Sequence, residues 1–151
     1  MNCADTNWLE AMFFADPADR RAVVERFLRR EKGVLLVSAI TRLEARNVFS
    51  RKSGEPEPPE WREFEADNRF YRDRLNWDLL RRDVFALVAR YAHKSKLGTF
   101  DLCIIAAARL AGATRILSFD QQLKALATAE GLKVFPDLDE SGKALLARLR
   151  A

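Results

Sequence analysis

The sequence is short of the residues that many enzyme sites require. Among its 151 residues there are one histidine, two cysteines and only six glycines. Cys3, Cys103 and the single histidine, His93, do not have the spacing of a zinc site. The chain also contains no Walker-type loop and no GxSxG motif. These absences exclude zinc enzymes, P-loop nucleotide hydrolases and serine hydrolases of the α/β-hydrolase type.

Long apolar runs and an excess of one charge are also missing. No run approaches the roughly 20 apolar residues that cross a bilayer, and the start does not resemble a signal peptide. Two cysteines in buried patterns are typical of reduced thiols, so we expect a cytoplasmic protein without membrane contact. Lys and Arg number 26 against 22 Asp and Glu, for a formal net charge of +4. This mild basic bias is compatible with binding to nucleic acid.

The apolar residues that are present predict an α/β fold. Amphipathic helical patterns alternate with short apolar runs, and one helix is expected over residues 17–32 with Asp16 as its N-cap. This alternation predicts a single domain over residues 1–151, a three-layer α/β/α sandwich with a central, mainly parallel sheet. Its strands are expected at residues 2–5, 34–37, 116–119 and 133–135.

The middle of the chain follows a different pattern. Residues 51–60 are rich in Pro and Gly, which predicts a surface loop. Pro59 can open a helix, and a second helix is expected over residues 80–92. We therefore expect a helical pair without a strand of its own, with one aromatic face on the first helix formed by Trp61, Phe64, Tyr71 and Leu75.

Four acidic residues occupy places that parallel topology would bring together. Asp5 and Asp120 directly follow predicted strands, and Asp101 begins an almost wholly apolar helix. Glu44 lies on the apolar face of another helix, where a lone carboxylate is costly. Because ligands bind at the carboxyl edge of such sheets, we expect the four side chains to converge there. Individually each has an ordinary explanation: helix capping, a helix dipole or a solvated face.

Converging carboxylates predict a metal site. At about 4 Å and an effective dielectric constant of 20, each pair of like charges costs roughly 4 kcal/mol. Some groups would then be protonated, or a divalent cation would bind them, and oxygen ligands favour Mg²⁺ or Mn²⁺. Such ions can activate a water and stabilise the leaving oxygen when a phosphodiester bond is broken. The sequence thus predicts a site that cleaves nucleic acid.

At these residues the chain resembles the PIN domain family and, more narrowly, its VapC toxins. The resemblance lies in Asp5-Thr6-Asn7, Glu44, the helix that begins at Asp101 and the segment Ser118-Phe119-Asp120. It implies a Mg²⁺-dependent ribonuclease and places an antitoxin protein and a second copy of the chain among the candidate partners. Asp5, Glu44, Asp101 and Asp120 would be the catalytic, metal-binding acids, supported by Thr6, Asn7 and Ser118.

Two surfaces are expected to contact partners. An antitoxin is expected in a groove of the early helices, with Trp8, Met12 and Phe13 as apolar anchors. Lys94 and Lys96 precede Asp101 on a loop that should border the crevice, so we expect them to bind phosphates of the RNA backbone.

Three other protein classes share parts of this pattern. A haloacid-dehalogenase-like phosphatase requires a second Asp two residues after Asp5, where this chain has Asn7. A response-regulator receiver requires a Lys at the end of the last strand, where Val134-Phe135-Pro136 stands. A non-catalytic nucleic-acid-binding or scaffold domain on the same fold remains the alternative. Metal-dependent cleavage of a generic RNA would discriminate it from a nuclease.

Overall fold

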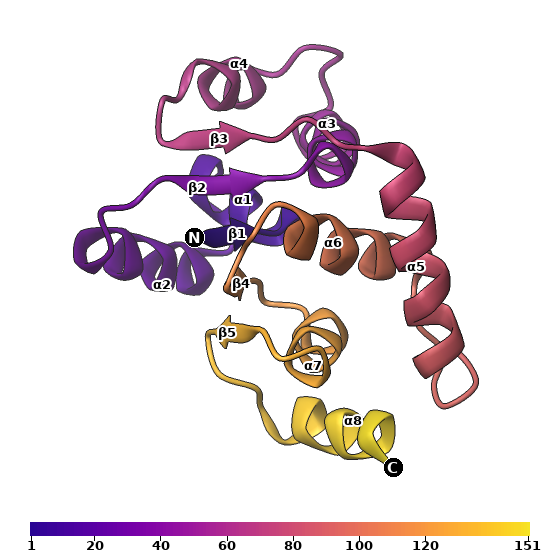
Figure 1. Ribbon diagram of the computed structural model, residues 1–151. Helices are drawn as coiled ribbons and strands as arrows, with labels where there is room; N and C mark the ends of the chain where they lie inside the picture. The colour runs from indigo at the N-terminus through magenta and orange to yellow at the C-terminus, as the bar shows by residue number, and fades with distance from the viewer.

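The computed structural model describes residues 1–151, in which strands and helices alternate (Figure 1). The five strands are β1 (Asn2–Ala4), β2 (Leu35–Val37), β3 (Phe70–Arg72), β4 (Arg115–Leu117) and β5 (Lys133–Phe135). The eight helices are α1 (Thr6–Phe13), α2 (Ala18–Arg30), α3 (Ala39–Ser53), α4 (Pro59–Ala66), α5 (Trp77–Tyr91), α6 (Thr99–Leu110), α7 (Gln121–Ala129) and α8 (Glu140–Arg150). None of these helices combines the length and apolar character needed to cross a membrane.

The sheet is parallel throughout. Its strands lie in the order β3-β2-β1-β4-β5, so that β1 is central. Cys3 in β1 is paired with Leu36 of β2 and with Ile116 of β4. The central strands are short and apolar, as expected when helices cover both faces of a parallel sheet. The prediction of an α/β fold around a parallel sheet is confirmed.

Alternation along the strands separates two cores. Successive strand residues point to opposite faces. Cys3, Leu36 and Ile116 pack into one core with residues of α5, α6 and α7. Ala4 and Leu117 pack into the other, with residues of α1, α2, α3 and α4. Figure 1 shows α6 near the centre, α5 at the right and α7 and α8 below, whereas α2 lies at the left and α4 at the top. The result is the layered arrangement that the pattern predicts.

The prediction of a single helix from Pro59 to Leu75 is wrong. α4 ends at Ala66, and the Asp67 carboxylate then accepts hydrogen bonds from the backbone N–H of Arg69 (2.9 Å) and from its guanidinium (2.6 Å). This local side-chain turn redirects the chain into β3, which pairs with β2 at the edge of the sheet. A three-residue strand is too short to show a period of two, and the aromatic residues of this segment do not share one helical face.

Two helix boundaries also differ from the prediction. α3 extends into the segment 51–60 and ends at Gly54, whose φ of 73° is the left-handed conformation that glycine favours. α2 begins at Ala18, so Asp16 does not cap it. Its N-cap is Pro17, which has no side-chain oxygen to offer the first turn. The extension of α3 matters most, because it carries two cations to the sheet edge described below.

The burial of Phe64 yields a test of the packing around α4. Its ring is fully buried and lies 5.0 Å from that of Phe70 (centroid to centroid). Phe64→Ala is expected to lower the free energy of unfolding by about 3–5 kcal/mol, because it removes these contacts and leaves a cavity. The control is Phe85→Ala on α5, where the residue is 67% exposed and the loss should stay below about 0.5 kcal/mol. Urea unfolding measures both, and equal losses would contradict the packing.

Candidate active site

Five carboxylates line one pocket at the C-terminal edge of the sheet, and four of them are the acids singled out from the sequence. Asp5 follows β1, Glu44 lies on α3, Asp101 is in the first turn of α6 and Asp120 precedes α7. They line a pocket of about 380 Å³, whose other lining residues are Thr6, Asn7, Glu10, Val48, Arg51 and Lys52. The structure therefore brings together all four acids singled out from the sequence. Their catalytic and metal-binding roles stay predictions.

Asp5 is held by the neighbouring strand and not by its own helix. Its backbone N–H donates to the carbonyl of Leu117 (3.0 Å), which extends the pairing of β1 with β4 by one residue. Ser118 Oγ donates to Asp5 Oδ2 (2.8 Å). Asp5 stands at the N-cap position of α1, but its side chain makes no capping hydrogen bond. Helix capping therefore does not explain why a carboxylate is buried there, with only 5% of the residue exposed.

Asp120 does cap its helix. Its Oδ1 accepts hydrogen bonds from the backbone N–H groups of Gln122 (2.8 Å) and Leu123 (3.2 Å) at the start of α7. Oδ2 makes no hydrogen bond within the chain. Capping fixes the orientation of the carboxylate and leaves one oxygen free toward the pocket that Asp120 lines. For Asp120, helix capping and a role at the pocket are therefore compatible explanations.

The two remaining acids lie on helices. Glu44 is half-buried on α3 and accepts a hydrogen bond from Thr6 Oγ1, which links α3 to the start of α1. Asp101 is half-buried in the first turn of α6 and makes no hydrogen bond or ion pair within the chain. The helix dipole favours a negative charge at this place, but the other three carboxylates oppose it. Asp101 is thus the least compensated member of the group.

Ser118 and Asn7 connect the turns that carry Asp5 and Asp120. Asn7 Oδ1 accepts a hydrogen bond from the backbone N–H of Phe119 (3.0 Å), and Ser118 Oγ accepts one from the N–H of Asp120 (3.0 Å). A hydroxyl has one proton, and Ser118 directs it to Asp5 at 2.8 Å, in preference to Asn7 Oδ1 at 3.3 Å. The two turns are therefore fixed relative to each other, which sets the spacing of the acids.

Burial and like charge both act on these acids. Burial raises the pKa of Asp5 to about 7, with contributions from Glu44 and Asp120, while the Ser118 hydrogen bond opposes the rise. The pKa of Asp101 is also raised to about 7, first by burial and then by the charges of Asp120, Asp5 and Glu44. The pocket therefore holds more negative charge near neutral pH than its own hydrogen bonds stabilise.

Two cations at the pocket were missed from the sequence. Arg51 and Lys52 line it from the last turns of α3. Lys52 Nζ contacts Glu10 Oε1 at 2.8 Å and also donates to the backbone carbonyl of Asp16, whereas Arg51 has no ion pair or hydrogen bond. The signal was present, because Arg51 follows Glu44 by two helical turns. The expectation that α3 ends at residue 50 concealed it.

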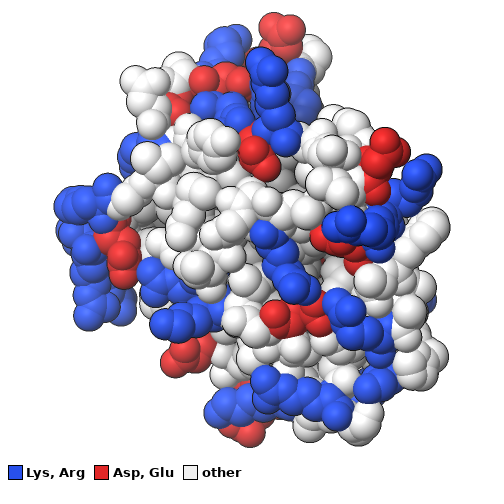
Figure 2. Space-filling view, viewed as in Figure 1, with Lys and Arg blue, Asp and Glu red and all other residues white.

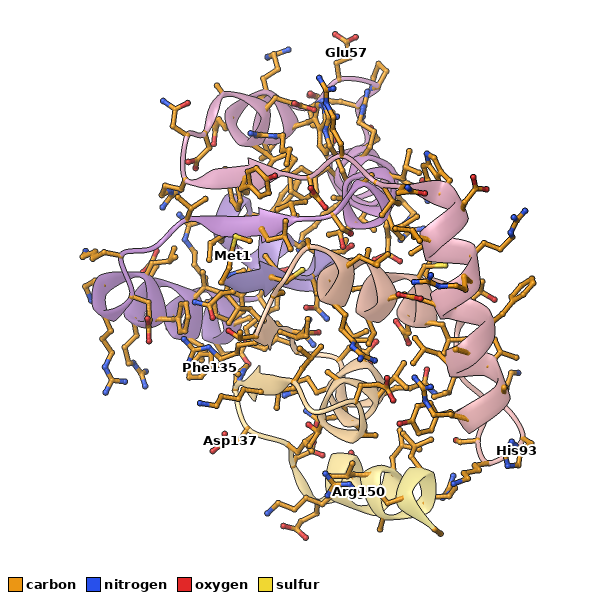
Figure 3. All side chains as sticks on the ribbon, in the orientation of Figure 1. Met1, Glu57, His93, Phe135, Asp137 and Arg150 are labelled. Atoms are coloured by element: carbon orange, nitrogen blue, oxygen red, sulfur yellow. The ribbon has the colours of Figure 1, made fainter.

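The lysines expected to bind substrate lie elsewhere. Lys94 Nζ donates to the backbone carbonyls of Leu149 (3.1 Å) and Ala151 (2.7 Å), and so it holds the C-terminal end of α8. Lys96 offers its carbonyl to Gln122 Nε2 (2.6 Å). Neither lysine lines the acidic pocket, and their contact with phosphates stays a prediction. Figure 3 places the neighbouring His93 just beyond the end of α5, on the outside of the molecule.

Trp8 cannot serve as the exposed anchor that the sequence suggested. It is fully buried and stacks on Phe119 with a centroid separation of 5.6 Å. A short helix with several apolar residues does not reveal by itself which of them the sheet covers. Met12 and Phe13 are only half-buried, and they pack against the same core.

No three of the His, Cys, Asp and Glu side chains are arranged as a ready coordination shell. The donor set nevertheless consists of carboxylate oxygens around an open pocket, and the pKa values of two of these groups are raised by burial and by the charges of neighbouring carboxylates. Mg²⁺ typically keeps several waters and binds through one or two carboxylates, so a closed cage of protein ligands is not required.

The parallel sheet and its acidic edge define a class, an α/β domain with a carboxylate-lined pocket beyond the ends of its strands. The chain belongs to the PIN domain family, whose sequence model matches residues 3–129. No curated protein sequence matches it.

Solved structures show the same fold at low sequence identity. VapC20 of Mycobacterium tuberculosis, a toxin that cleaves the sarcin-ricin loop, has a TM-score of 0.70 and 17% identity, covering 87% of this chain and 96% of its own. A toxin–antitoxin complex from Klebsiella pneumoniae has a TM-score of 0.59 and 22% identity, and the match covers 81% of this chain and 88% of that one. VapBC2 of Rickettsia felis, bound to a DNA fragment from its promoter, has a TM-score of 0.61 and 14% identity, and the match covers 88% of this chain and 96% of that one. At these identities the likeness establishes the fold.

The raised pKa values predict how stability depends on pH in the absence of divalent ions. Asp5 has a pKa of about 7 in the folded protein and about 3.9 in an unfolded chain. Between these values the folded protein binds more protons, so this group's contribution to the free energy of unfolding decreases as pH rises from about 4 to 7. Asp5→Asn cannot ionise and should gain stability relative to wild type over that interval.

Urea unfolding in EDTA at several pH values measures this difference. The control is Asp78→Asn, because the Asp78 side chain is 90% exposed and should produce no pH-dependent gain. A difference between Asp5→Asn and wild type that stays constant with pH would contradict the raised pKa.

Proposed function

We propose that this protein is a Mg²⁺-dependent endoribonuclease and the toxin of a toxin–antitoxin pair. The observation that carries the proposal is the convergence of Asp5, Glu44, Asp101 and Asp120 on one pocket. Two of these acids have pKa values raised to about 7, partly by the others, and a divalent cation would relieve that repulsion. Membership of the PIN domain family supports a nuclease at this pocket.

In this proposal, Asp5 and Asp101 hold the principal Mg²⁺ ion. Glu44 and Asp120 complete the site directly or through water, and Mn²⁺ fits the same oxygen donors. A bound ion would supply an activated water and stabilise the leaving oxygen during hydrolysis of a phosphodiester bond. Binding requires ionised carboxylates, so metal affinity should fall as pH decreases below about 7.

The chain's other residues support the site by orienting it. Ser118 directs its proton to Asp5, and Thr6 donates to Glu44, so each hydroxyl restrains one acid. Such partners keep ligands in position and tune their basicity. Asn7 holds the turn before Asp120 through the N–H of Phe119.

The toxin assignment draws on the solved relatives. VapC20 is a toxin that cleaves the sarcin-ricin loop, and the Klebsiella pneumoniae structure is a toxin–antitoxin complex. By analogy, an antitoxin protein and a second copy of the chain are proposed partners, RNA is the proposed substrate and the cytoplasm the proposed site of action. A non-catalytic nucleic-acid-binding domain would have no need to gather four carboxylates in one pocket.

Removal of single ligands tests the catalytic role. Asp5→Asn and Asp101→Asn should each lower kcat/KM on a generic RNA by roughly 100-fold or more, since even outer-shell partners of metal sites contribute 10–100-fold. EDTA should abolish cleavage by wild type. The matched control is Asp78→Asn, an exposed carboxylate on α5 that should retain full activity.

A second readout does not depend on activity. Mg²⁺ should raise the melting temperature of wild type near pH 8, because it binds the folded state, and the shift should disappear in Asp101→Asn. Cleavage that persists in EDTA and in both Asn variants would refute the proposal. A wild type that binds RNA but never cleaves it would favour the non-catalytic alternative.

Arg51 is expected to bind a substrate phosphate. It lines the acidic pocket without an ion-pair partner of its own, so its charge can attract a backbone that the carboxylates repel. Arg51→Ala should raise KM with little effect on kcat, and should reduce the slope of log affinity against log salt by about 0.7, as for one contact with a single strand. The double variant Lys94→Ala, Lys96→Ala tests the other route. A larger change in that variant than in Arg51→Ala would locate the RNA path along the lysine loop.

A further inference from the structure

A second pocket is lined by the two residues that flank Asp120 in the sequence. It has a volume of about 330 Å³ and is lined by Asp19, Arg20, Val23, Phe119, Gln121, Lys124, Pro136 and Asp137. We call it the Phe119 pocket. Phe119 and Gln121 flank Asp120 in the sequence, and the N–H of Phe119 donates to Asn7, which lines the acidic pocket. The two pockets therefore share the turn that carries Asp120.

One wall of the Phe119 pocket is formed by Arg20 and Phe119, which continue a stack of flat groups that reaches into the core. Arg20 places its guanidinium 5.1 Å from the centroid of the Phe119 ring. The same ring stacks on Trp8, which is fully buried (5.6 Å, interplanar angle 17°). Trp8 in turn contacts Phe27 edge to face. A planar cation backed by two aromatic rings is thus held at the wall of an open pocket.

Arg20 is available to a ligand. It makes no ion pair and no hydrogen bond within the chain, unlike the adjacent Arg21, which pairs with Glu25 at 3.0 Å. The pocket's other cation, the buried Lys124, already has partners, since its Nζ donates to the backbone carbonyls of Pro136 (2.9 Å) and Asp137 (3.3 Å). Lys124 therefore shapes the pocket wall, and Arg20 is the group left with unused donors and an unused flat face.

The Phe119 pocket also has hydrogen-bond acceptors at its rim. Asp19 and Asp137 line the pocket with carboxylates that have no ion-pair partner. Figure 3 shows Asp137 on the connection after β5, with its side chain directed away from the ribbon. A ligand of this pocket would therefore be flat, polarisable and equipped with N–H donors at its edge. Phosphate alone does not fit this description, because it has no flat face and the carboxylates would repel it.

We infer that the Phe119 pocket binds a nucleobase of the RNA strand, next to the phosphate at the acidic pocket, and that it favours guanine. This inference rests on the proposed ribonuclease function for its substrate class. Unstacked bases are bound in single-stranded RNA by stacking on aromatic rings or guanidinium planes and by hydrogen bonds to their edges. Guanine offers two adjacent donors, N1–H and the N2 amino group, to a carboxylate, whereas uracil offers one donor, N3–H, between two carbonyl oxygens that a carboxylate repels.

The path of the strand is consistent with this placement. Arg20 is near the start of α2, and the rest of that helix and its C-terminal extension carry exposed basic residues at Arg26, Arg29, Arg30 and Lys32. Figure 2 shows Lys and Arg side chains gathered at the left, where α2 lies in Figure 1. Such a basic surface can bind backbone phosphates without reading sequence, leaving base choice to the pocket.

The test is equilibrium binding of fluorescent RNA hexamers to the full chain in EDTA, so that no cleavage is needed. The probes are all-uridine RNA and the same RNA with a single guanine. Wild type should bind the guanine probe about tenfold more tightly, the scale of one good base contact. Arg20→Lys keeps the charge but loses the guanidinium plane, and it should remove this preference while the all-uridine affinity stays within about twofold. Asp137→Asn should reduce the preference.

Arg81→Lys is the matched control, an exposed arginine on α5 that lines neither pocket and whose replacement should leave the preference intact. Equal binding of both probes, binding of neither, or a preference that survives Arg20→Lys would each overturn the inference. The experiment distinguishes failure of this inference from failure of the proposed function. A guanine preference in a protein that cleaves no RNA with Mg²⁺ would refute the proposed function alone. Cleavage without an Arg20-dependent preference would refute the base pocket alone.

Discussion

Repulsion among carboxylates is the constraint on which the C-terminal edge of this sheet depends. The pKa values of Asp5 and Asp101 are raised to about 7, first by burial and then by the charges of the neighbouring carboxylates. A pocket of this kind costs stability, as functional sites commonly do. The surrounding contacts limit that cost without removing it. Ser118 donates to Asp5, Thr6 donates to Glu44, and the first N–H groups of α7 hold Asp120. Only Asp101 has no such partner.

The same contacts connect the acidic pocket to the rest of the fold. Asn7 and Ser118 join the turn after β1 to the turn after β4, so the spacing of Asp5 and Asp120 follows from the pairing of the two strands. Phe119, between Ser118 and Asp120, inserts into the stack of Trp8 beneath it. The turn is thereby fixed from both sides. A rigid support of this type is what precise positioning of reactive groups requires.

The cations around the pocket differ in how far the chain uses them. Lys52 is engaged by Glu10, whereas Lys94 lines neither pocket and is held by the C-terminal carbonyls of the chain. Arg51 and Arg20 have no such partners, and each lines one of two adjacent pockets. The positive charge of these unpaired guanidinium groups can attract an RNA strand that the carboxylates would repel. The arrangement suits a polyanionic strand better than a small anionic ligand.

Local patterns were sufficient to predict the parallel α/β fold and the four acids. Buried strands are recognisable because helices cover both faces and leave no polar alternation, and Asp5 and Asp120 directly follow such runs. Glu44 was recognisable because a carboxylate interrupts an apolar stripe. β3 was missed because three residues show no periodicity. The end of α3 was misplaced because residues 51–60 were assigned to a loop as a whole, whereas the helix continues to Ser53 and Gly54 terminates it.

What only the tertiary structure decided is which side chains meet. The sequence by itself determined four of the five strands, the parallel character of their sheet and the residue types at the strand ends, since these follow from burial and backbone geometry within a few residues. The choice of Arg51 over Lys94 at the pocket, the burial of Trp8 and the stack of Arg20 on Phe119 all join positions distant in the chain. Such contacts depend on how helices pack across the sheet, and no local pattern encodes that.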